Sequence, residues 1–175
     1  MRRFLIAVVS CGLLASSAFA EPLGGRLEKF SADFNAAAKS LKVPTRIAKS
    51  SCGGEVRASC TFVVTDNITV IAASMPDKTT LGDVTIHMDG RPSEIPAYFQ
   101  TVDVLIKLYA PKATADERRV ILRQLVQQIA DKPAPKVTID GLEVSVLLVP
   151  GVASLTSVNR GDIGLDTTAE PLFAD

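Results

Sequence analysis

The spacing of apolar residues divides the chain into a helix, a run of strands, a second helical part and a final group of strands. Over residues 26–41, apolar side chains recur every three or four positions, the spacing that places them on one face of an α-helix. The members of this stripe are Leu27, Phe30, Phe34, Ala37, Ala38 and Leu41. Pro44 ends the pattern, because the residue before a proline is disfavoured in helical geometry. We therefore predict an amphipathic helix that lays its stripe on a sheet.

From residue 45 the period changes to two, which places successive side chains on opposite faces of a strand. Residues 45–51 are a modest first strand candidate, and residues 68–73 form a third strand after a turn at Asp66-Asn67. The second strand is indicated by the alternating positions Val56, Ala58, Cys60, Phe62 and Val64. In a fourth strand, over residues 81–89, one face holds Val84, Ile86 and Met88 and the other holds Asp83, Thr85, His87 and Asp89.

Two helices are predicted next. Apolar positions from Ile95 to Tyr109 fit a helical stripe that ends before Pro111. Thr114 and Glu117 have the spacing of a capping box, in which each side chain bonds the backbone N–H of the other residue. The stripe of the second helix then consists of Ile121, Leu122, Leu125, Val126 and Ile129. Because the connection between the helices is short, we expect them to form an antiparallel pair.

The last part of the domain returns to strands. Residues 137–149 are expected to form a hairpin around Asp140-Gly141, a strong short-range hairpin signal. Residues 153–158 are a further strand candidate, and periodicity is lost after Arg160. The sequence thus predicts an α+β fold: an N-terminal helix, an antiparallel sheet, an antiparallel helix pair packed on one face, and a C-terminal β-hairpin added to the sheet. We expect one domain over residues 21–160 and a mobile acidic tail over residues 161–175.

The segment from Cys52 to Cys60 stands between the first helix and the strands. Two cysteines in an exported chain are more often bridged than free. Gly53-Gly54 supplies the conformational freedom that a tight reversal needs. We therefore predict a disulfide-closed hairpin with a structural role. The alternatives are a redox pair, which usually has closer spacing, and a metal thiolate site, which needs further ligands.

Residues 1–20 have the features of a secretory signal peptide. Arg2 and Arg3 precede an apolar run, and Ala18-Phe19-Ala20 is a small-x-small cleavage site that would leave Glu21 as the first mature residue. Two alternatives are a lipoprotein cleavage box that leaves Cys11 lipidated and a twin-arginine signal with altered spacing. No later segment is long and apolar enough to span a bilayer. We expect a periplasmic protein, with secretion from the cell as the second choice.

Composition narrows the function classes. The chain carries 19 basic and 19 acidic residues, and loss of Arg2 and Arg3 with the signal gives a mature net charge of −2. A near-neutral chain lacks the basic face that nucleic-acid binding requires. The chain has no Trp, which weakens sugar-binding and base-stacking hypotheses. It contains neither a nucleophile-elbow motif nor a His-Glu-x-x-His motif nor a phosphate-binding glycine loop. We therefore predict no cofactor.

His87 is the single histidine, and it alternates with Asp83 and Asp89 on one strand face. Residues two apart on a strand lie about 7 Å apart on the same face, so His87 and Asp89 are weak candidates for metal ligands. A complete site needs ligands from a neighbouring strand. The alternative interpretation is a solvated strand face.

Arg118, Arg119 and Arg123 cluster on the second helix of the pair. They are candidates for binding an acidic partner or an anionic lipid surface. The alternative is a solvated helix face with intrahelical ion pairs, such as Asp103 with Lys107.

Our leading hypothesis is a non-enzymatic exported protein that acts by protein–protein interaction, as an envelope accessory factor or an inhibitor. The second is a carrier of a small ligand or lipid in an apolar pocket between helices and sheet. The third is a hydrolase or metal-dependent enzyme that uses His87. The partner is expected to be another envelope protein, and the oligomeric state stays open.

Overall fold

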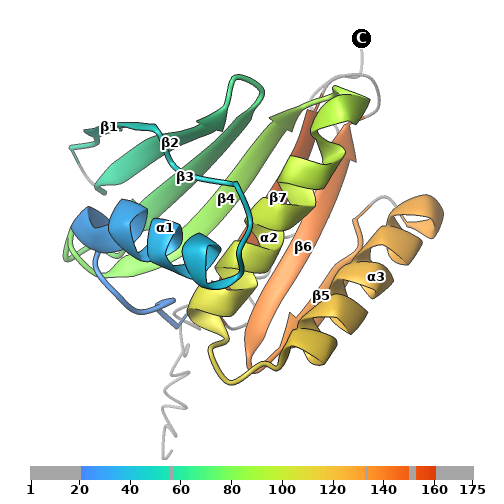
Figure 1. Cartoon of the computed structure of the whole chain (residues 1–175). Coiled ribbons are helices and arrows are strands. Elements are labelled where there is room, and N and C mark those ends of the chain that lie inside the picture. The colour runs from blue at the N-terminus through green and yellow to red at the C-terminus, as the bar shows by residue number, and fades with distance from the viewer. Residues whose placement is uncertain (1–20, 56, 133, 150–152, 161–175) are drawn as a thin grey trace, which may run out of the picture.

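The computed structural model describes residues 21–55, 57–132, 134–149 and 153–160. It contains one seven-stranded antiparallel sheet with three α-helices (Figure 1). The predicted α+β class is therefore confirmed, as is the antiparallel helix pair. The predictions for the signal peptide and Cys11, for Val56 and for the acidic tail lie outside the described residues.

The first half of the chain builds one side of the sheet. A 3₁₀ turn, η1 (Leu27–Lys29), leads into α1 (Phe30–Ser40), within the predicted helical span. The strands β1 (Lys49–Gly53), β2 (Ser59–Thr65), β3 (Ile68–Ser74) and β4 (Leu81–Asp89) then pair in sequence order. The first strand begins later than the predicted residues 45–51. The fourth matches its predicted bounds.

The second half supplies the helix pair and the other side of the sheet. A 3₁₀ turn, η2 (Pro92–Glu94), precedes α2 (Ile95–Tyr109), and α3 (Ala115–Asp131) follows after a short loop. The last strands are β5 (Lys136–Ile139), β6 (Leu142–Val149) and β7 (Ala153–Arg160). The predicted hairpin turn is present: Asp140 and Gly141 have φ values of 49° and 73°, the positive angles of a tight two-residue hairpin.

The strand order is β1-β2-β3-β4-β7-β6-β5, so the last strand of the chain pairs with β4 in the middle of the sheet. All three helices lie on the same face of this sheet (Figure 1). The core between the two layers consists of side chains from α1, α2 and α3, where α3 contributes Leu125, and of the alternate strand residues that face them. Its largest fully buried members include Phe30, Phe34, Ile68, Ile86, Tyr98 and Leu105.

The disulfide prediction is confirmed. Cys52 and Cys60 lie directly opposite each other in the β1–β2 register, and their sulfur atoms are bonded at 2.06 Å. The bridge pins the edge strand β1 to β2. Gly54 in the connecting turn has a φ of 112°, and a Cβ atom there would collide with the Arg57 carbonyl oxygen, so the tight reversal requires glycine at this position. No helix of the described residues is long and apolar enough to cross a membrane.

Candidate functional site

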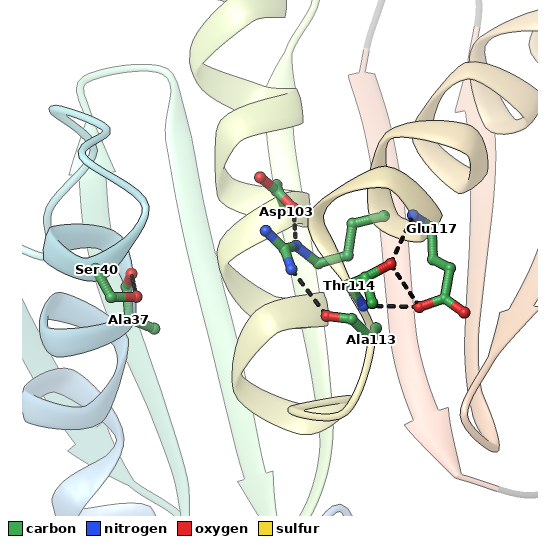
Figure 2. A network of polar contacts seen from close by, with 7 residues as sticks. Ala37, Ser40, Asp103, Ala113, Thr114 and Glu117 are labelled. Atoms are coloured by element: carbon green, nitrogen blue, oxygen red, sulfur yellow. Dashed lines mark hydrogen bonds and ion pairs between the residues drawn. The ribbon is translucent and has the colours of Figure 1, made fainter.

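Three regions of the surface merit attention: a groove among the helices, the His87 strand face, and the sheet face opposite the helices. The groove has a volume of about 700 Å³ and lies between the end of α1, the middle of α2 and the start of α3. Figure 2 shows Ser40 of α1 on one side and Asp103, Thr114 and Glu117 on the other. Ser40 is occupied locally, because its Oγ donates to the Ala37 carbonyl at 2.7 Å.

Arg118 connects α3 to α2 at the floor of this groove. Its Nε donates to Asp103 Oδ1 at 2.8 Å, and its Nη1 donates to the Ala113 carbonyl at 3.0 Å. The residue is buried. A buried guanidinium with a carboxylate and a carbonyl partner holds its neighbours in one geometry. The arrangement therefore fixes the helix pair and the loop between the two helices.

The start of α3 carries the predicted capping box. Glu117 N donates to Thr114 Oγ1 at 3.3 Å, and Thr114 N donates to Glu117 Oε2 at 2.7 Å. The Thr114 hydroxyl donates to the same carboxylate oxygen at 2.8 Å. These hydrogen bonds lower the pKa of Glu117, because they favour the charged carboxylate. The first backbone N–H groups of a helix have no acceptor within the helix. The capping box supplies acceptors for two of these groups at the start of α3.

The three arginines proposed as partner-binding residues do not form one patch. Arg118 points inward to Asp103, which pairs with it rather than with Lys107 as the sequence suggested. Arg119 is exposed and pairs with Asp116 at 2.8 Å within α3. Arg123 is exposed and is not among the residues that line the groove. In the groove, Arg118 and Arg119 thus each pair with a carboxylate, and the Arg118–Asp103 pair connects α3 to α2.

His87 lies on β4 with its Nε2 at 3.8 Å from Asp89 Oδ1. Asp83 on the same strand face is engaged elsewhere, because Arg57 Nη2 donates to its Oδ2 at 2.5 Å. Within the described part of the chain, no group of three or more His, Cys, Asp or Glu residues is placed to hold a metal ion. The neighbouring strands therefore add no third ligand of these kinds to the His87–Asp89 pair.

The sheet face opposite the helices is called the open face below. Its residues stand in rows that cross the strands. One row passes from β2 to β6 through Val63, Thr69, His87, Leu155 and Leu147. The next row passes over the same strands through Thr61, Ile71, Thr85, Ser157 and Ser145. The first row thus holds three aliphatic side chains, and the second holds hydroxyl groups at every position except Ile71.

Two aliphatic side chains stand out on the open face. Ile71 on β3 is 39% exposed and Leu147 on β6 is 48% exposed. Val63 and Leu155 are half-buried on the same face. These residues were part of predicted strands, but the sequence alone did not identify them as a surface, because the face of each strand depends on which strands pair.

At one end of the open face lies Asn159, the residue before the end of β7. It is only 2% exposed, although no described helix lies on this face. Its Nδ2 donates to Ser157 Oγ at 3.2 Å. Its Oδ1 is buried without a hydrogen-bond partner among the described residues. Buried acceptors of this kind are uncommon in folded proteins, so this atom marks a position where a donor is missing.

The opposite, helix-facing side of β7 carries polar residues inside the core. Ser154 Oγ donates to Tyr98 Oη at 2.8 Å, and Thr156 Oγ1 is hydrogen-bonded to the same oxygen. All three residues are buried. Burial raises the pKa of the Tyr98 hydroxyl, because a phenolate is poorly solvated there. The trio is enclosed and links α2 to β7.

No protein-family model matches the chain, and comparisons with curated proteins and with solved structures gave no match.

Proposed function

We propose that this protein is exported to the periplasm and acts there without catalysis, by binding another envelope protein through the open face. The observation that carries the proposal is the open face itself, with Ile71 and Leu147 exposed on a sheet whose helices all lie on the other side. On this face the half-buried Leu155 lies beside Leu147, and β4 and β7 separate Leu147 from Ile71; exposed aliphatic surface on a regular sheet is typical of interaction sites.

The dimensions of the open face support this proposal. Seven strands at about 4.8 Å spacing give a width of about 29 Å. A strand of eight residues, such as β7, extends for about 25 Å. The resulting area of about 700 Å² is close to the roughly 800 Å² that each partner contributes to a standard protein–protein interface. The hydroxyl groups of the second row provide hydrogen-bonding positions beside the aliphatic residues.

The chemistry of the face indicates the kind of partner. The two rows described above comprise ten residues between β2 and β6. His87 is the one titratable residue among these ten. A partner of matching chemistry therefore presents aliphatic and small polar groups to the middle of the face, while Lys49 on β1 and Lys136 on β5 stand at the ends of these rows. The Cys52–Cys60 bridge supports the proposed location, because disulfides persist in oxidising compartments.

The test compares capture of partners by variants of the mature protein. Leu147→Asp and Ile71→Asp place a charge on the open face, whereas Val120→Asp places one at a 49% exposed position on α3. We expect an envelope protein that is crosslinked to the parent protein and to Val120→Asp but not to the open-face variants, and that binds again when both proteins are purified. A partner bound equally by the open-face variants, or substrate turnover without any bound partner, would contradict the proposal.

The carrier hypothesis retains one supporting feature. A hollow of about 350 Å³ lies between α3 and β5, lined by Val120, Ile121 and Ile139 together with Asp116, Glu117 and Gln124. Its volume is at the lower end of the range for small-molecule sites. Native mass spectrometry of the protein as isolated is the direct test: bound mass that disappears in Ile121→Asp would favour a carrier, and apo protein would count against one.

A further inference from the structure

The groove between α1, α2 and α3 contains a buried arginine with one guanidinium nitrogen to spare. Nε and Nη1 of Arg118 bond Asp103 and the Ala113 carbonyl (Figure 2), whereas its Nη2 has no hydrogen-bond partner among the described residues. This nitrogen is not fully buried, because the buried side-chain atoms without a partner in the described part of the chain are Ser74 Oγ and Asn159 Oδ1. Since Arg118 lines the groove, its Nη2 is a hydrogen-bond donor for a molecule bound there.

A second cation stands close to this nitrogen. Lys107 lies one helical turn after Asp103 on α2, so the two side chains leave the same side of that helix with their Cβ atoms about 6 Å apart. Lys107 is half-buried and lines the groove. Within the described residues it forms no ion pair, and Asp103 pairs with Arg118 instead. A half-buried ammonium group without a counter-charge attracts an anion.

The charges around the groove favour a ligand with a single negative charge. Asp103 balances Arg118, and Asp116 balances Arg119. Lys107 is therefore the one charge left without a counter-charge among the described residues that line the groove. A monocarboxylate supplies that counter-charge, and its two oxygens accept hydrogen bonds from the Lys107 ammonium and from Arg118 Nη2.

The rest of the lining is suited to an aliphatic chain. Leu41, which follows the end of α1, and Leu122 on α3 are both half-buried, and Ala113 and Ala115 add further methyl groups. Small-molecule sites commonly combine apolar walls with a few polar groups, and the groove volume of about 700 Å³ lies within their usual range. A ligand that matches the groove therefore carries an apolar part as well as an acidic head group.

We propose that the groove binds a small anionic amphiphile, a carboxylic acid with an aliphatic chain. Its carboxylate lies between Lys107 Nζ and Arg118 Nη2, and its chain lies against Leu41 and Leu122. The groove is formed by the helices, on the other side of the sheet from the open face. The inference therefore does not rest on the partner-binding proposal, and each can fail without the other.

Isothermal titration calorimetry of the mature protein with sodium decanoate, kept below its micelle-forming concentration, tests the proposal. Two related probes separate the contributions of head group and chain. Acetate has the head group without the chain, and decyltrimethylammonium has the chain with a positive charge. We expect one decanoate to bind per protein chain, acetate to bind at least about tenfold more weakly, and decyltrimethylammonium to show no saturable binding.

Two pairs of variants locate the site. Lys107→Gln removes the unpaired charge, and Lys112→Gln is its matched control because Lys112 is exposed and does not line the groove. Leu122→Asn removes an aliphatic contact, and Val126→Asn is its control at a 49% exposed position on the same helix. We expect each groove variant to weaken decanoate binding at least about tenfold and each control to leave it unchanged. Circular dichroism establishes that every variant is folded.

Four outcomes would overturn the inference. Undetectable binding of decanoate would show that the groove is not a site for aliphatic carboxylates. Equal affinity of the parent and Lys107→Gln would show that this charge does not hold the head group. Equal binding of decyltrimethylammonium would show that the chain alone is recognised. Binding that persists in both groove variants but disappears in Ile121→Asp would place the ligand in the hollow between α3 and β5 instead.

Discussion

The contact between Arg118 and Asp103 is the polar connection between α2 and α3, and its removal gives a quantitative prediction. Arg118→Met keeps most of the side-chain length but removes the charge. Asp103 is then left with a side chain that is only 23% exposed and without its cation, and the Ala113 carbonyl loses its donor.

The magnitude follows from these two losses. Breaking a fully buried ion pair costs about 3–5 kcal/mol, because a buried charge remains uncompensated. The partial exposure of Asp103 permits some hydration, so the expected loss of unfolding free energy is about 2–3 kcal/mol. For a chain of this size, that corresponds to a decrease in Tm of about 4–12 °C.

Urea unfolding measures this loss, and Arg123→Met is the matched control. Arg123 lies on the same helix and is exposed, so we expect its substitution to change the unfolding free energy by less than about 0.5 kcal/mol. The double variant Arg118→Met/Asp103→Leu should recover part of the stability, because it leaves no unpaired charge. If Arg118→Met were no more destabilising than Arg123→Met, the assigned role of Arg118 would be wrong.

Three further predictions concern the disulfide, the buried hydroxyl trio and the α3 cap. The Cys52–Cys60 bridge closes a loop of sequence separation 8, so reduction should lower the unfolding free energy by about 2.5 kcal/mol in thermal or urea unfolding; a change below about 0.5 kcal/mol would refute its role as a staple. Tyr98→Phe leaves buried hydroxyl groups without their shared partner and should cost about 1–3 kcal/mol in urea unfolding; a neutral effect would mean that these groups find other partners. The Glu117 carboxyl has a folded pKa below its ordinary value of 4.5, so its contribution to stability is complete above that value and is lost as the pH falls through the lower folded pKa. The stability difference between the parent and Glu117→Gln should therefore shrink on acidification, and an equal difference at neutral and strongly acidic pH would contradict this assignment.

The sequence predicted the local elements well because each carries its own signal. The bounds of β4 and α2 follow from uninterrupted periodicity, and Thr114 with Glu117 marks the start of α3. Asp140-Gly141 specifies its hairpin through the positive φ angles that it accepts.

The interactions that connect distant segments were not predictable in the same way. In β7, Ser154 and Thr156 face the core while Leu155 faces outward, the reverse of what hydrophobicity alone predicts. The reason is tertiary: the Tyr98 hydroxyl satisfies both polar groups from another element. Similarly, the Arg118–Asp103 pair depends on how two helices dock, which no local pattern records.

The open face could not be identified from the sequence, because it too depends on how distant segments pair. It exists because β7 inserts beside β4, which aligns Leu147 and Leu155 with His87 and Thr69 in one row. Sequence analysis recognised His87 as a feature of interest but placed it in a metal-site hypothesis. In the structure it stands in the middle of a surface that combines aliphatic and hydroxyl groups.

The central claim is that the open face is the recognition surface. Its most direct test is the dissociation constant of the purified partner for the parent protein, for Leu147→Asp and for Val120→Asp. We predict at least about a tenfold weaker affinity for Leu147→Asp, equivalent to about 1.4 kcal/mol, and an unchanged affinity for Val120→Asp. An affinity that is unchanged by Leu147→Asp but lost in Val120→Asp would place the recognition surface on the helices and contradict this account.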